Sequence, residues 1–158
     1  MPKIDISKLS VKTGSIYPKP HDKAMDGRSS IRLSDPAGLT QFGVNITILE
    51  PGARSSLRHW HENQDEFAIV LSGECTLIDD TGETPLKVGD CAAFPAGDAN
   101  GHCIANTSNA EARFLIVGTR TPTEIAHYSD LNMMIRMDET NAVFTHKDGS
   151  PYSGEEND

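Results

Sequence analysis

Hydrophobic and polar positions alternate in short runs along the middle of the chain. Eight such segments lie between Gln41 and Gly118, separated by breaks that contain Gly, Asp, Asn or Pro. They are residues 42–49, 56–61, 66–71, 75–78, 85–88, 91–94, 102–106 and 112–118. These break residues favour tight turns. The spacing leaves no room for crossover helices, so the pattern predicts an all-β fold, an antiparallel sandwich or barrel.

The segments on either side of this pattern differ from it. Residues 1–40 are polar and rich in turn residues, and we expect an extended N-terminal arm there, followed by a barrel core over 41–120. Residues 121–158 form a C-terminal extension. It opens with Thr121-Pro122-Thr123-Glu124, which has the form of a capping box and predicts a short helical turn. We expect 125–137 to be irregular or extended, 145–152 to be an exposed turn, and 154–158 to be a frayed acidic tail.

Composition narrows the classes of partner. The chain of 158 residues suits one domain, and its 14 basic against 23 acidic residues give a net charge of −9. This charge disfavours nucleic acid and anionic membranes as partners. No apolar run is long enough to span a bilayer, and no signal peptide is recognisable. Cys75, Cys91 and Cys103 form no CxxC motif, so we expect buried free thiols in a cytoplasmic protein.

The candidate chemistry lies in three histidines and one glutamate. His59 and His61 are two residues apart, so in a strand their side chains share one face. Glu66 opens the next apolar strand, and a cation partner would explain an inward-facing carboxylate there. His102 begins a further strand and could approach from the facing sheet. His59 and His61 alone could be a surface or packing pair, and Glu66 alone could be a solvated strand end. The four residues together suit Mn, Fe, Co, Ni or Zn and leave coordination positions open.

Two glycine-containing motifs surround these residues. The first is Gly52-x6-His59-x-His61-x4-Glu66-x6-Gly73, and the second is Gly89-x5-Pro95-x-Gly97-x4-His102-x3-Asn106. Together they resemble the two conserved motifs of the cupin superfamily. The resemblance implies a small antiparallel jelly-roll β-barrel that binds its metal through His59, His61, Glu66 and His102. This chain departs from the family pattern by extra residues in each motif, including the loop 98–101 before His102.

The resemblance also implies a range of functions. We expect one divalent transition metal per chain (Mn, Fe, Ni or Zn), acting as a Lewis acid on a small oxygenated molecule. The chain looks most like small bacterial single-domain cupins, some of which are labelled sugar-phosphate isomerases. An isomerase of a sugar or sugar phosphate is therefore the first hypothesis. The alternatives are an iron-dependent dioxygenase, a decarboxylase of a small carboxylate, and a non-catalytic ligand-binding domain. A small-molecule substrate and a homodimer formed through edge strands are the expected partners.

Overall fold

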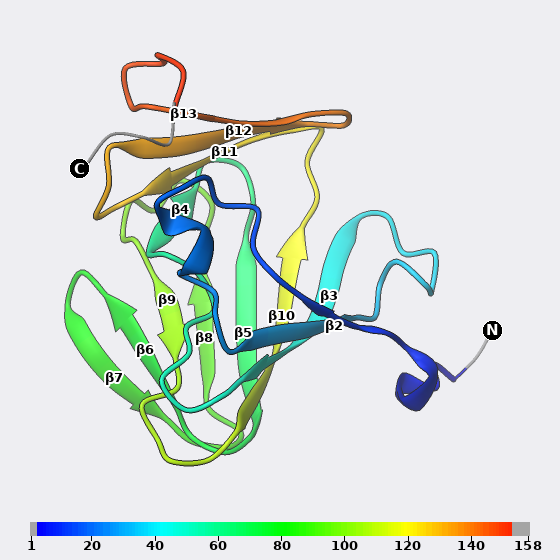
Figure 1. Ribbon diagram of the computed structural model, residues 1–158. Coiled ribbons are helices and arrows are strands. Elements are labelled where there is room, and N and C mark those ends of the chain that lie inside the picture. The colour runs from blue at the N-terminus through cyan, green and yellow to red at the C-terminus, as the bar shows by residue number, and fades with distance from the viewer. Residues whose placement is uncertain (1–2, 153–158) are drawn as a thin grey trace.

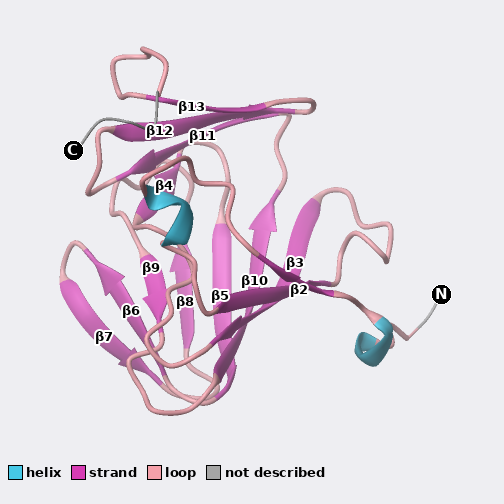
Figure 2. Ribbon diagram, viewed as in Figure 1, coloured by secondary structure: helices cyan, strands magenta, loops and turns pink. Residues whose placement is uncertain are grey.

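The protein is built almost entirely of antiparallel β-strands, as the all-β prediction required (Figures 1 and 2). The computed structural model describes residues 3–152. Within them the only helical segments are two 3₁₀ turns, η1 (Ile6–Lys8) and η2 (His21–Lys23). None of the helices in this part of the chain has the length and apolarity needed to cross a membrane.

The strands form three sheets, which together make up the barrel. The largest has six strands, in the order β1 (Val11–Thr13), β2 (Arg28–Arg32), β3 (Phe42–Leu49), β10 (Ala112–Thr119), β5 (Glu66–Ser72) and β8 (Cys91–Phe94). A four-stranded sheet follows the order β13 (Ala142–Thr145), β12 (Met133–Asp138), β11 (Thr123–Tyr128) and β4 (His59–His61). The third contains β7 (Gly82–Leu86), β6 (Cys75–Asp79) and β9 (Cys103–Ala105).

Two strands lie in the N-terminal segment, where the sequence predicted only an extended arm. β2 pairs along its whole length with β3, and β1 pairs with the outer edge of β2. The reason is a buried apolar contact, because Ile31 lies opposite Ile46 and packs with Ile46 and Ile48. Residues 11–13 and 28–32 therefore belong to the barrel's largest sheet.

The C-terminal extension is also made of strands. The predicted helical turn at 121–124 is wrong, because Thr123 begins β11. Burial alternates along this strand, with Glu124, Ala126 and Tyr128 inside, which is the period of a strand and not of a helix. The region 125–137 is extended, as expected, and forms the β11–β12 hairpin. The predicted exposed turn at 145–152 is wrong at its start, where Thr145 and His146 are buried; the predicted acidic tail lies outside the described residues.

Besides the isoleucine cluster of β2 and β3, the core contains two clusters of buried residues. One cluster, drawn from both the six-stranded and the three-stranded sheets, includes Leu49, Val70 and Phe114. The other lies on β11 and β12 and includes Tyr128 and Ile135. β5, which begins with Glu66, contributes Ala68 and Val70 to the first cluster, and β4, which carries His59 and His61, pairs with β11 of the second. Packing in both clusters therefore holds strands that carry candidate residues.

Candidate metal centre and its cavity

β4 places two histidines on the inner face of the barrel. It pairs with β11, which sets His59 opposite Tyr128 and His61 opposite Ala126. Their side chains are only 15% and 11% exposed. Trp60, between them, faces the other way and stacks on His127 with ring centroids 4.3 Å apart. The alternation expected from the sequence is therefore confirmed.

Glu66 and His102 complete the cluster. Oε2 of Glu66 lies 3.2 Å from Nε2 of His102, 3.5 Å from Nε2 of His61 and 3.9 Å from Nε2 of His59. Glu66 is the first residue of β5 and is inward-facing, in step with buried Ala68 and Val70. One oxygen thus lies within 4 Å of three imidazole nitrogens, and the structure brings together all four residues that the sequence singled out.

The longer loop before His102 does not displace that residue. His59 and His102 form a two-way backbone bridge, with N–H···O distances of 3.1 and 2.9 Å. Gly101, the residue before His102, passes close to Ser129. A Cβ at position 101 would lie 1.8 Å from Oγ of Ser129, so the close packing of this loop requires glycine. His102 is held further by Phe94, whose ring is stacked on the imidazole at a centroid distance of 3.5 Å.

Hydrogen bonding and burial favour a neutral imidazole at His59, which faces an anionic carboxylate at Glu66. Nδ1 of His59 is 2.9 Å from the carbonyl oxygen of Leu57, to which it donates, leaving the Nε2 lone pair directed at the cluster. Burial lowers the pKa of His59 to about 4. Burial would raise the pKa of Glu66, but hydrogen bonds from His102 and His61 outweigh it and lower the pKa well below its usual value. For His61, burial is outweighed by the two neighbouring carboxylates, Glu66 and Glu124, which together raise its pKa.

This donor set fits a transition metal. The ligand atoms of His59, His61 and Glu66 all lie within 4.8 Å of one another, and His102 adds a third imidazole beside Glu66. Imidazole nitrogen with a single carboxylate suits borderline divalent metals better than calcium or magnesium, which prefer all-oxygen sites. The residues can therefore hold a metal ion. Their donor atoms suit several divalent transition metals and do not select one of them.

A buried carboxylate behind His61 was missed by the sequence analysis. Oε1 of Glu124 lies 3.7 Å from Nδ1 of His61, and its side chain is 1% exposed. Backbone N–H groups of Glu62 and Ile125 donate to Oε1 at 2.9 Å, and that of Asn63 donates to Oε2 at 3.1 Å. The capping-box pattern concealed this residue. The alternation of β11, with Tyr128 and Ala126 on the same face, was the one signal that could have revealed it.

A cavity of about 550 Å³ opens on the candidate metal ligands. All four of them line it, together with Tyr17 and side chains of β1, β2 and β3. Burial raises the pKa of Tyr17, and burial together with Tyr17 raises that of Tyr128, which also lines the cavity. The two phenols therefore remain protonated and can donate hydrogen bonds over the usual pH range.

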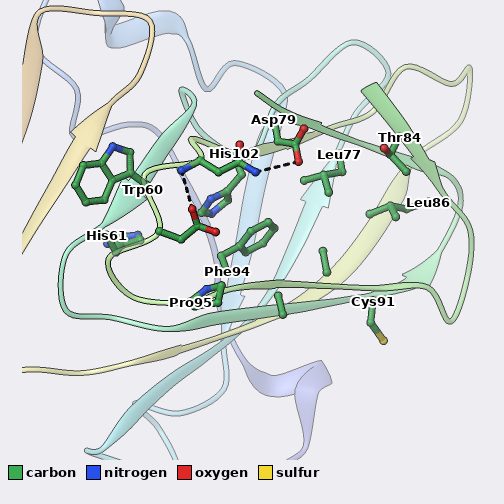
Figure 3. Close-up of a pocket in the computed structure, with 14 residues that line it drawn as sticks. Trp60, His61, Leu77, Asp79, Thr84, Leu86, Cys91, Phe94, Pro95 and His102 are labelled. Atoms are coloured by element: carbon green, nitrogen blue, oxygen red, sulfur yellow. Dashed lines mark hydrogen bonds between the residues drawn. The ribbon is translucent and has the colours of Figure 1, made fainter. Parts of the chain in front are cut away.

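A second hollow, of about 210 Å³, is also lined by two of the histidines, His61 and His102 (Figure 3). His61, His102 and Phe94 contribute to both hollows. Cys91 lines this second hollow and is exposed, so the expectation of three buried thiols is wrong for this residue. All three cysteines are free, and Cys75 and Cys103 are buried as expected.

The fold is that of a cupin. A model of the cupin domain matches residues 45–118, which include all four candidate ligands. A crystal structure of a sugar phosphate isomerase from a cupin superfamily, from Silicibacter pomeroyi, is 56% identical with a TM-score of 0.95, and 98% of each chain is covered. The chain described here belongs to the cupin superfamily.

Two other relatives are more distant. A protein from Acidithiobacillus ferrooxidans, named as a proposed sugar phosphate isomerase, has a TM-score of 0.78 at 21% identity, over 93% of this chain and 91% of that one, which shows a shared fold. The oxalate-binding protein of Thermotoga maritima is 36% identical over 69 residues, which are 44% of this chain. That match spans only 54% of the relative's own length.

Proposed function

We propose that this protein is a metal-dependent isomerase of a small sugar or sugar phosphate. The observation that carries the proposal is a cavity of about 550 Å³ whose wall contains all four candidate metal ligands. Its volume falls within the range of about 300–1,000 Å³ typical of sites for small molecules. The name of the Silicibacter relative, which covers nearly the whole chain, supports the same class of reaction.

The residues of the site would have two roles, which are binding the metal and hydrogen bonding to the substrate. A metal held here would polarise a carbonyl group and a neighbouring hydroxyl of the substrate as a Lewis acid. His59, His61 and His102 would supply neutral nitrogen ligands, and Glu66 would offset part of the ion's charge. Tyr17 can donate a hydrogen bond to a substrate oxygen because its phenol remains protonated.

Glu66 is better suited to be a ligand than a general base. Among the described residues that line the cavity it is the one carboxylate. Its Oε2 lies 3.5 Å from Nε2 of His61 and 3.2 Å from Nε2 of His102, so it points into the cluster of nitrogen donors. We therefore assign it to metal binding.

The proposal is tested first by metal analysis of protein purified without a histidine tag or chelator. We expect about one equivalent of a divalent transition metal. It should be lost in His61→Ala and retained in His127→Ala, a matched control whose ring stacks on Trp60 outside the cluster. The loaded protein is then incubated with aldoses, ketoses and their phosphates, and products are followed by NMR. Wild type that binds no metal, even after reconstitution, would contradict the proposal.

Binding of a small dicarboxylate is the second candidate. It is favoured by the 36% identity, over 69 residues, to an oxalate-binding protein. Calorimetry with oxalate and metal-loaded protein separates the two functions. Tight oxalate binding without turnover of any sugar would favour a binding protein. Iron in the purified protein, with oxygen uptake on a carboxylate, would favour the oxidative alternative.

A further inference from the structure

One wall of the main cavity is basic and comes from the N-terminal strands. Arg28, Ser30 and Arg32 alternate along β2, so their side chains share one face, and all three line the cavity. Lys12 on β1 and Thr47 on β3 lie directly opposite Ser30 on its two sides. Both also line the cavity. In Figure 1 the chain segment with β1 and β2 runs in front of β5 and β10.

The charge of this wall is opposite to that of the whole chain. Lys12, Arg28 and Arg32 face a cavity with Glu66 as its one carboxylate among the described lining residues, although the chain carries a net charge of −9. Glu66 is engaged by the histidines. Arg32 also contacts Asp35 at 3.4 Å, in a pair that is largely exposed and therefore weak. Local positive charge of this kind concentrates anions in a cavity.

Arg28 is the central residue of the wall. Nη1 donates to the carbonyl oxygen of Ser55 at 3.1 Å, and Nη2 donates to that of Gly14 at 3.3 Å. Its Nε is buried and has no hydrogen-bond partner among the described residues. Burial lowers its pKa, although the guanidinium remains charged at neutral pH. A cation held by neutral carbonyl groups alone is incompletely compensated, and an anionic ligand would supply the missing charge.

Hydroxyl and amide groups surround these cations. Ser30, Thr47, Ser55 and Asn45 all line the same cavity. A phosphate monoester offers several oxygens that accept hydrogen bonds from guanidinium, ammonium and hydroxyl groups together. The wall is therefore richer in donors than a small neutral sugar alone requires.

We propose that the basic wall of β1 and β2, centred on Arg28, binds the phosphate group of a phosphorylated substrate whose other oxygens reach the metal centre. This proposal rests on the isomerase function proposed above and specifies its substrate class. It makes phosphate binding a property of the N-terminal strands, separate from metal binding by His59, His61, Glu66 and His102.

Inorganic phosphate is the probe, and its binding is measured by calorimetry and ³¹P NMR. Wild type is compared in the zinc-loaded form and after removal of metal. We expect phosphate to bind both forms. Arg28→Met should weaken binding by roughly 10- to 100-fold, the effect of losing charge-assisted hydrogen bonds. Arg28→Lys, which keeps the charge, should fall in between.

Arg113→Met is the matched control, because Arg113 is exposed on β10 and pairs with Glu111 away from the cavity. It should bind phosphate as wild type does. Thermal melts establish whether each variant is folded. If Arg28→Met does not fold, the comparison is made with Arg28→Lys, which should bind phosphate more weakly than wild type. Binding that requires zinc and ignores Arg28 would place the anion on the metal and overturn the proposal. An equal loss in Arg113→Met would also overturn it, since general charge would then be the cause.

Two further outcomes separate this proposal from the isomerase function. If metal-free protein binds oxalate more tightly than phosphate, and oxalate displaces bound phosphate, the wall is a carboxylate site. That result would overturn the phosphate assignment. Phosphate binding that depends on Arg28, in a protein that isomerises no sugar phosphate, would support this inference and contradict the proposed reaction. If the protein binds no phosphate but isomerises unphosphorylated sugars, the proposed reaction would be supported and this inference would be contradicted.

Discussion

Glu124→Gln is the substitution that best separates a metal-orienting role from a structural one. The carboxylate is buried behind His61, with Oε1 3.7 Å from Nδ1 of that ring. Nδ1 of His61 is buried and has no hydrogen-bond partner among the described residues. A carboxylate beside the outer nitrogen of a metal-binding histidine fixes the ring and raises its basicity. Glutamine keeps the size of the side chain but removes the charge.

The structure sets the expected magnitudes. Glutamine can keep its carbonyl oxygen at the Oε1 position, where the N–H groups of Glu62 and Ile125 donate. Its amino group then meets the N–H of Asn63, which donates to Oε2 in the wild type. Loss of one charge-assisted hydrogen bond lowers the free energy of unfolding by about 1.5–3 kcal/mol. Loss of the carboxylate beside His61 should weaken metal binding by about 10- to 100-fold.

Two measurements on the same variant distinguish these effects. Denaturant unfolding of metal-free protein reports the stability term, and competition with a chelator reports zinc affinity. Glu62→Gln is the matched control, because its carboxylate contacts His127 at 2.7 Å on the outside of the site. Zinc affinity unchanged in Glu124→Gln, with reduced stability, would refute an orienting role and leave Glu124 as an acceptor for backbone N–H groups only.

Two other predictions concern the loop before His102 and the thiols. Gly101→Ala should lower the free energy of unfolding by about 1–3 kcal/mol and weaken zinc binding, because its Cβ would overlap Ser129. The added Ser129→Gly substitution should restore both in denaturant and chelator titrations, and wild-type behaviour of Gly101→Ala alone would contradict the close approach. Burial raises the pKa of Cys75 to about 11, so at pH 8 only about one thiol in a thousand is ionised and its reactivity rises only as pH approaches that value. A thiol reagent should modify exposed Cys91 alone in the native protein, as checked by mass spectrometry, and modification of Cys75 before unfolding would contradict this.

The inward positions of three of the four candidate ligands could be predicted from local sequence patterns. His59 and His61 share a face through the two-residue period of a strand, and Glu66 keeps the inward register of its own strand. The position of His102 followed from the motif resemblance. Its backbone bridge to His59 is a contact between distant segments that no local pattern contains.

The parts that sequence analysis missed depend on tertiary packing. In β8 the run Cys91-Ala92-Ala93-Phe94 is apolar throughout, so nothing in it shows that Ala92 faces inward and Cys91 outward. Polar β2 is a strand because Ile31 meets the isoleucines of β3, which are distant in sequence. Glu124 is stabilised in the interior by backbone N–H groups of another loop, and its local sequence instead suggests a helix start.

The site is divided between two parts of the chain with different roles. The matched cupin region, residues 45–118, contains all four candidate ligands. Arg28, Tyr17, Tyr128 and Glu124 lie outside that region, and the first three line the cavity. Substitutions in the flanking strands can therefore change which small molecule fits the cavity while the four candidate metal ligands stay the same. A comparison confined to residues 45–118 covers the candidate metal ligands and part of the cavity wall, whereas one that spans 98% of the chain also covers Tyr17, Arg28 and Tyr128.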